Sequence, residues 1–360
     1  MLVQKINLAT NKRQVGEIEL DDISTTAKDT LGGSELDAPY RTLYVSEDFT
    51  TGGAFYDTLA GAITFANTLA YNVLLKIYPG TYTGNYSLDP NVILEFMPET
   101  FLVATDKTIS VLILAAGARV YGKVRIEYAI TSGYAVTMAK NCIFEALTCA
   151  ADTDAIVIND VSGSAIDSQI RVKELGKVNV IGLQGNLYID SDKFSQLAYA
   201  GANDCYVNCK LFKKDLTVST GKVFLNTERY FKESDTIFDI SGGTTIANGR
   251  VDNYDDTTNS TTGEGHIAKV AAGTLKLHDF YAKNSSGGVI WGAGAGTLII
   301  GSSVLQSTNI GGGSSTYPIA GLGGFTVKYV GNTGINLATQ NPPIVELITA
   351  NKRQDVNITI

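Results

Sequence analysis

Residues 73–82 of the chain read VLLKIYPGTY, and residues 88–94 read LDPNVIL. Each segment contains a short run of aliphatic and β-branched residues, which favours a strand. Pro79 and Gly80 end the first run and Pro90 precedes the second, so residues that form turns bound each run. The two segments therefore predict short strands that are joined by tight turns.

Short apolar runs of this kind recur through most of the chain, separated by Gly, Asn, Asp or Pro. Their length and β-branched content are typical of strands. Between them there is no second helical pattern as strong as the one described below, which argues against a sheet built from βαβ units. The predicted strands are residues 73–78, 92–97, 109–114, 119–126, 155–158, 178–181, 187–189, 216–225, 274–281 and 297–300.

The spacing of the first runs distinguishes a solenoid from a sandwich. Their centres, Ile77, Leu94 and Ile113, follow one another at nearly even intervals. Coils of this length fit a parallel β-helix, in which each apolar run returns to the same interior face, so these three side chains are expected inside. A β-sandwich is the alternative, but its usual hairpin dipeptides are almost missing: Asn248-Gly249 is the one instance.

One amphipathic helix is predicted over residues 57–70, before the first of these strands. Asp57 occupies the position expected of an N-cap. Apolar residues then recur three and four positions apart, which gives a single apolar stripe. A helix with one such stripe has to lie on something, and the exposed first coil of a solenoid is a surface that it would seal. The stripe consists of Leu59, Ala62, Ile63, Ala66, Leu69 and Ala70.

The segments 58–63, 73–82 and 88–94 together resemble the opening of pectate-lyase-like right-handed β-helix proteins. In that family an amphipathic helix caps the coil, a strand ends in Pro-Gly-x-Tyr, and the next coil begins at an Asn-Val-x-Leu segment. The resemblance covers residues 40–97 and continues in style to about residue 305. It implies an all-β fold: a right-handed, single-stranded parallel β-helix with one N-terminal helical cap and a small β-rich C-terminal segment.

The ends of the chain differ in composition from the strand-rich middle, which we place at residues 39–306. Residues 1–38 are polar and predict an extended N-terminal arm that is ordered against a partner. Residues 307–360 begin with a glycine-rich stretch and end in strand-like pieces. We interpret them as a crossover followed by a C-terminal β segment that pairs with another chain on oligomerisation.

Charge and hydropathy exclude several classes of protein. The formal net charge is −8, from 28 Lys and Arg against 36 Asp and Glu, and this balance argues against a nucleic-acid-binding protein. Neither the ~18 consecutive apolar residues of a membrane span nor the apolar core of a signal peptide is found, so no membrane insertion is expected and synthesis in a cytoplasm is predicted. The four cysteines are expected to be free thiols.

Acidic residues in the region 231–265 provide weak catalytic candidates. Next to His266, they faintly resemble the Asp-Asp pair that precedes a Gly-His-Gly in polygalacturonases, but here Ile267 follows the histidine. A solvated acidic loop is the simpler explanation of the same residues. Asp190 and Asp192 also lie two apart on a predicted strand and so point to one side. The catalytic candidates of the region are Asp252, Asp255, Asp256 and Glu264.

Other chemistry has less support in the sequence. Asp152 and Asp154 have the spacing of oxygen ligands, but no local pattern commits to a metal site, and no cofactor is expected. Exposed tyrosine rings would provide stacking surfaces for a sugar or a receptor. The candidates for this role are Tyr188, Tyr199 and Tyr254, with Tyr40, Tyr82 and Tyr86 as further possibilities.

These features lead to an expectation about function. Several phage spikes are right-handed β-helices, so the resemblance implies a structural and adhesive virion protein: a bacteriophage tail spike, tail fibre or head fibre. We expect it to be made in the host cytoplasm, to form a homotrimer, to dock on other virion proteins through residues 1–38, and to meet a host surface polysaccharide. The alternative is a polysaccharide-degrading hydrolase or lyase on the same fold, so catalytic activity is left open.

Overall fold

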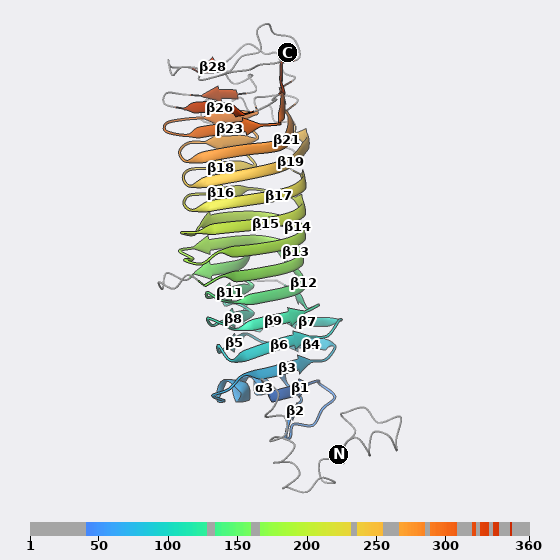
Figure 1. The fold of residues 1–360 in the computed structure, drawn as a ribbon. Coiled ribbons are helices and arrows are strands. Elements are labelled where there is room, and N and C mark those ends of the chain that lie inside the picture. The colour runs from blue at the N-terminus through green and yellow to red at the C-terminus, as the bar shows by residue number, and fades with distance from the viewer. Residues whose placement is uncertain are drawn as a thin grey trace.

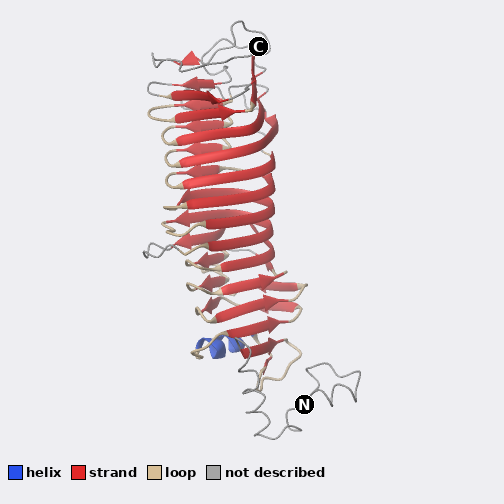
Figure 2. Cartoon of the chain, in the orientation of Figure 1, coloured by secondary structure: helices blue, strands red, loops and turns tan. Residues whose placement is uncertain are grey.

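A computed structural model describes residues 41–127, 134–159, 166–231, 236–254, 266–284, 289–307, 319–321, 325–330, 334–337 and 346–347. These residues form a parallel β-solenoid with one helix near its N-terminal end (Figures 1 and 2). Apart from an isolated bridge between Gly52 and Phe55, the described strand pairings are parallel. The predicted all-β fold is confirmed, and two facing antiparallel layers are ruled out.

Each coil contributes to three faces, and the first, face A, is the longest ladder. Its strands stack in register from one coil to the next, and β2 (Phe55–Tyr56) pairs with the first of them. The ladder runs through β1 (Arg41–Val45), β3 (Val73–Ile77), β6 (Val92–Phe96), β9 (Arg119–Gly122), β12 (Ile143–Asn159), β13 (Ser168–Ile181), β14 (Leu187–Ala200), β15 (Asp204–Phe212), β17 (Lys222–Tyr230), β19 (Thr244–Tyr254), β21 (Thr274–Asn284), β23 (Thr297–Gly301) and β26 (Thr326–Val330).

Face B follows face A along the chain within each coil. It begins with the short strands β4 (Gly80–Thr83), β7 (Thr100–Val103) and β10 (Arg125–Glu127). From β12 to β21 the same strand bends at the corner and continues from face A into face B. The ladder then ends with β24 (Val304–Ser307) and β27 (Gly334–Leu337).

Face C closes each coil, and the long strands β12, β13 and β14 also run into it. The other strands of this face are short. They are β5 (Tyr86–Leu88), β8 (Leu112–Leu114), β11 (Val136–Met138), β16 (Leu216–Val218), β18 (Phe238–Ile240), β20 (Ala268–Val270), β22 (Ile290–Gly292), β25 (Ile319–Gly321) and β28 (Glu346–Leu347).

Stacked aliphatic and aromatic side chains fill the interior. Because successive strand residues point to opposite sides, every second residue is buried and the residues between them face outward. On face A the inward residues of neighbouring coils lie directly above one another, each at most 2% exposed. This interior row is Leu75, Leu94, Val120, Phe144, Ile170, Ile189, Val207, Leu225, Ala247, Leu277 and Ile300.

Ile113, which we expected inside, faces outward and is 39% exposed. It lies on face C between the inward Leu112 and Leu114, whereas Leu94 lies on face A. The register partner of Leu94 in the next coil is Val120, which comes after Ile113 in the chain. The evenly spaced centres of the apolar runs therefore belong to two different faces. This happens because the coils are not equal in length.

Coil length varies because loops are inserted at the corners. The first coil is long: Arg41 is the register partner of Val73, and both the Gly52–Phe55 turn and the helix lie between them. The coils are shortest where Tyr188 pairs with Tyr206 and Tyr206 pairs with Phe224, since there the strands follow one another through tight turns.

The predicted helix is present as α3 (Leu59–Asn67), shorter than the expected 57–70. It lies beside β1 and β2 at the N-terminal end of the solenoid (Figure 1), and the part of its predicted apolar stripe that lies within the helix is buried. Leu69 is only partly buried and Ala70 is exposed, because both lie beyond the end of the helix. Its N-cap is Thr58 and not Asp57: the Thr58 hydroxyl accepts the N–H of Gly61 at 3.3 Å. The Asp57 carboxylate accepts a hydrogen bond from the Thr51 hydroxyl instead.

The predicted N-terminal arm, residues 1–38, lies outside the described residues. Within 307–360 the described strands are β25 to β28, and each pairs in parallel with a strand of the preceding coil. These strands therefore extend the three faces of the solenoid. Within the described ranges, no helix combines the length and the apolar character needed to cross a lipid bilayer.

Candidate functional site

Four successive coils line an open groove of about 520 Å³ at the corner between faces A and B. We call it the corner groove. Each coil contributes three consecutive residues at the point where its strand bends, so the lining repeats from coil to coil. The groove consists of residues 171–173, 190–192, 208–210 and 226–228.

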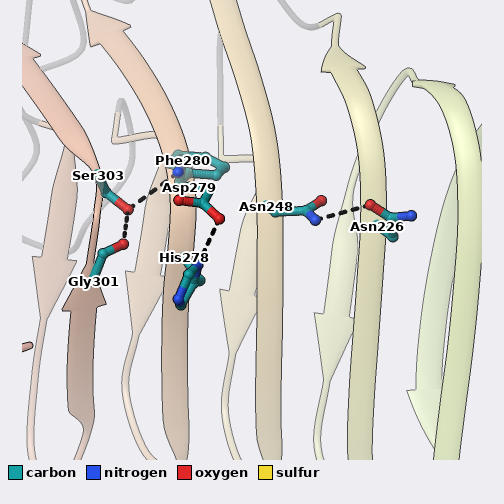
Figure 3. Close-up of polar contacts among 7 residues, drawn as sticks. All are labelled: Asn226, Asn248, His278, Asp279, Phe280, Gly301 and Ser303. Atoms are coloured by element: carbon teal, nitrogen blue, oxygen red, sulfur yellow. Dashed lines mark hydrogen bonds and ion pairs between the residues drawn. The ribbon is translucent and has the colours of Figure 1, made fainter.

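A row of polar side chains runs along the groove, parallel to the solenoid axis. Arg171, Asp190, Asn208 and Asn226 are register partners in consecutive coils. The Nδ2 of Asn226 donates to the Oδ1 of Asn208 at 2.9 Å. The Nδ2 of Asn248 in the next coil donates to the Oδ1 of Asn226 at 2.8 Å, as Figure 3 shows. These hydrogen bonds between side-chain amides hold Asn208 and Asn226 in fixed orientations.

His278 and Asp279 lie on β21, the strand that follows β19 in the stack (Figure 3). The Nδ1 of His278 is 2.8 Å from the Oδ2 of Asp279, and both side chains are well exposed. Asp279 has a φ of 51°, a left-handed conformation that aspartate tolerates better than most residues. The corner thus remains polar and strongly bent beyond the groove itself.

Ion pairs orient three of the charged side chains of the groove. Arg171 contacts Glu145 at 2.9 Å, and the ammonium of Lys210 contacts Asp192 at 2.7 Å. The hydrogen bond from Lys210, aided by its charge and by that of Lys173, lowers the pKa of Asp192. Asp192 is therefore held as a carboxylate, which accepts hydrogen bonds and does not act as a general acid at neutral pH.

An aromatic stack borders the corner groove on face A. The rings of Tyr188 and Tyr206 are 5.1 Å apart and nearly parallel, and those of Tyr206 and Phe224 are 4.7 Å apart. The ammonium of Lys222 lies 4.1 Å from the centre of the Phe224 ring. Tyr188 and Tyr206 are 36% and 37% exposed, so the edge of the stack is on the surface.

The aromatic stack and the polar row belong to one surface. Each ring precedes a polar side chain by two positions on the same strand, and residues two apart on a strand point to the same side. The chain therefore repeats an aromatic residue, a buried aliphatic residue and Asp or Asn once per coil. The three repeats are Tyr188-Ile189-Asp190, Tyr206-Val207-Asn208 and Phe224-Leu225-Asn226.

The tyrosines proposed from the sequence have different environments. Tyr188 is exposed in the aromatic stack, but Tyr199, which we expected on the surface, is only 2% exposed. It points inward on face C, and its hydroxyl donates to the carbonyl oxygen of Asn203 at 2.7 Å. Tyr82 and Tyr86 are also buried, each 4% exposed. Nothing is described of the side chain of Tyr254, and Tyr40 lies outside the described residues.

The acidic candidates of region 231–265 fall largely outside the described part of the chain. Asp252 lies on β19, but nothing is described of its side chain, and Asp255, Asp256 and Glu264 lie outside the described residues. The neighbouring His266 is only 1% exposed, and its ring lies 5.6 Å from that of Trp291. In contrast, Asp190 and Asp192, which we expected on one side of a strand, both line the corner groove.

Sequence reasoning missed Tyr206, Asn208, Phe224 and Asn226 as members of a site. A signal for them was present: the aromatic, aliphatic and Asp or Asn pattern recurs at equal intervals along the chain. The centres of the apolar runs do not reveal this repeat, because they belong to different faces of the solenoid.

A second hollow of about 760 Å³ lies on the same corner, nearer the N-terminal end. Arg125 lies over the ring of Phe101, 5.8 Å from its centre, beside Lys123.

Across the described ranges, no three His, Cys, Asp or Glu side chains gather as a metal-binding group. Comparison with protein-family models, with curated proteins and with solved structures gave no significant match.

Proposed function

We propose that the chain is a structural and adhesive protein that binds a polysaccharide along the corner groove. The observation that carries this proposal is the repeated unit of an outward-facing aromatic ring and a polar side chain, such as Tyr206 with Asn208, in three consecutive coils. A linear polymer of similar units is the ligand that a linear repeat of this kind suits.

The chemistry of the groove fits sugar units. Amide and carboxylate oxygens accept hydrogen bonds from sugar hydroxyls, and amide and ammonium groups donate to them. The exposed edges of the stacked rings offer apolar surface to a sugar. Coils repeat every ~4.8 Å, which is close to the length of one sugar unit, so neighbouring units would meet equivalent sets of side chains.

The proposed setting is a bacteriophage tail spike, tail fibre or head fibre. The solenoid architecture and the resemblance of residues 40–97 to pectate-lyase-like β-helices support this setting. In the same proposal the chain forms a homotrimer, is assembled into a virion, and contacts other virion proteins through residues 1–38. The ligand would then be a polysaccharide of the host surface.

Isothermal titration with a panel of capsular and O-antigen polysaccharides tests the binding. We expect the double variant Tyr206→Ala/Asn208→Ala to weaken the binding of a ligand from this panel by at least about tenfold, because it removes one ring and one amide from the centre of the groove. The matched control, Leu211→Ala, lies on face B of the same coil and should leave affinity unchanged. Equal affinities for the double variant and the control would overturn the assignment of the site.

The same samples distinguish binding from degradation. New reducing ends, or the absorbance of an unsaturated uronate, would identify a hydrolase or a lyase instead of an adhesin. In that case the rates of polysaccharide cleavage by Asp190→Asn and Asp252→Asn should be compared. The carboxylate of Asp190 lies in the groove, and that of Asp252 was proposed from the sequence.

A further inference from the structure

Face C differs from the other two faces in its outward side chains. Over seven consecutive coils, the central outward position of this face carries no ionisable residue. On faces A and B the corresponding rows hold residues such as Glu145, Arg171, Glu174 and Lys193. The uncharged row consists of Ser87, Ile113, Thr137, Val157, Asn179, Ala198 and Thr217.

The uncharged row is partly apolar, and it is at least partly exposed on both sides of one covered position. Most of its side chains are small, and its isoleucine, Ile113, is 39% exposed, whereas Val157 is only 5% exposed. Tyr134 reaches across the strand that carries Val157, and its hydroxyl accepts a hydrogen bond from Asn179 at 3.2 Å. At ~4.8 Å per coil, the row is roughly 29 Å long.

Charged side chains on exposed sheet faces keep one molecule from packing against another. In a symmetric assembly a face lies near copies of itself, so a row of ionised residues would meet charges of its own sign. An uncharged row avoids that repulsion and is complementary to itself. Beyond Thr217 the row continues with Asp239 and Lys269, whose opposite charges are adjacent.

We propose that copies of this chain associate side by side through face C. In a coil with three faces, the corner between faces A and B is opposite face C. Association through face C therefore leaves the corner groove facing outward, away from the other copies. The number of copies, three, comes from the proposed function, but the contact itself does not depend on polysaccharide binding.

The test introduces charge into the centre of the row. In the full chain, the double variant Ala198→Glu/Thr217→Glu places two carboxylates on face C, and neither native side chain fills the interior. Light scattering at micromolar concentration should give wild-type protein a mass of three 38.3 kDa chains and the variant a mass of one chain. The control variant Leu211→Glu, on face B of a neighbouring strand, should keep the wild-type mass.

A second variant separates loss of contact from loss of folding. Mixing Ala198→Glu/Thr217→Glu with Ala198→Lys/Thr217→Lys should raise the mass above that of one chain, because opposite charges then meet across two of the three contacts. Circular dichroism of each variant alone should remain that of a β protein. A monomeric wild type, or a Glu variant that keeps the wild-type mass, would overturn the proposal. Unchanged polysaccharide affinity per chain in the Glu variant would show that the groove works independently.

Discussion

Alternation along each strand assigns opposite roles to neighbouring residues. Leu94 points into the solenoid and contacts the coils on both sides, since its register partners are Leu75 and Val120. Ile93, next to it, faces outward and is only partly buried. Two side chains of equal size and hydrophobicity therefore contribute differently to stability.

Leu94→Ala should lower the free energy of unfolding by roughly 2–5 kcal/mol, because it leaves a cavity in a stacked interior row. Ile93→Ala, the control, should lower it by less than half of that amount. Denaturant unfolding of both variants and the wild type measures the difference. Equal losses would mean that the inward and outward sides of β6 have been assigned wrongly.

The thiol groups are expected to be inert in the folded protein. Burial raises the pKa of Cys149 to about 12 and that of Cys209 to about 11, from an ordinary value near 9. All four cysteines are buried, so reagents do not reach them, and Cys149, Cys205 and Cys209 form few thiolates at pH 8. Ellman's reagent at that pH should detect no rapidly reacting thiol in the native protein and four reactive thiols after unfolding.

The same shift predicts how stability depends on pH. The folded state favours the protonated Cys209 thiol, so its contribution to stability is fully present below pH 9 and is lost as the pH rises towards about 11. Tyr82 and Tyr86, whose pKa values burial raises to about 12, act in the same direction. Thermal unfolding should therefore occur at progressively lower temperature from pH 9 upward. A midpoint that is constant up to pH 11 would contradict this account.

At the scale of elements, α3 seals the start of the solenoid and depends on its own N-cap. The Thr58 hydroxyl accepts the N–H of Gly61, and the buried stripe ends at Ala66. Thr58→Ala should destabilise the helix by about 1 kcal/mol. Hydrogen exchange at the Gly61 amide should become faster by the corresponding factor.

Asp57→Ala is the matched control for the helix. It removes the carboxylate that accepts from Thr51 but leaves the cap in place, so exchange at Gly61 should change little. Faster exchange in this variant than in Thr58→Ala would restore Asp57 as the N-cap that the sequence favoured.

The sequence predicts some elements of this structure and not others. The helix and the solenoid could be predicted, because a single apolar stripe and repeated short strands follow from local periodicity. The orientation of Ile113 and the burial of Tyr199 could not, since both depend on the face of the coil to which a strand belongs. The corner groove could not be predicted for a related reason. Its residues are far apart in the sequence and become neighbours only through the register between coils.

At the scale of the whole molecule, the coil is the repeating unit of the structure. Deleting residues 206–223 removes one complete coil and brings Phe224 to the register position of Tyr206. Because each coil contacts only its neighbours, we expect the shortened chain to fold with a similar circular dichroism spectrum and a similar melting temperature. Deleting residues 206–214 alone should prevent folding, since half a coil places inward residues on the wrong face.

The corner groove lies on the short coils between Gln169 and Phe224, which leave no room for an inserted loop at that corner. The groove is therefore open along its side. A polysaccharide chain can enter it at any point along the polysaccharide, and no free end of the polysaccharide is needed. One long polysaccharide can then bind several copies of the protein at once, so the combined attachment lasts longer than the binding of a single copy.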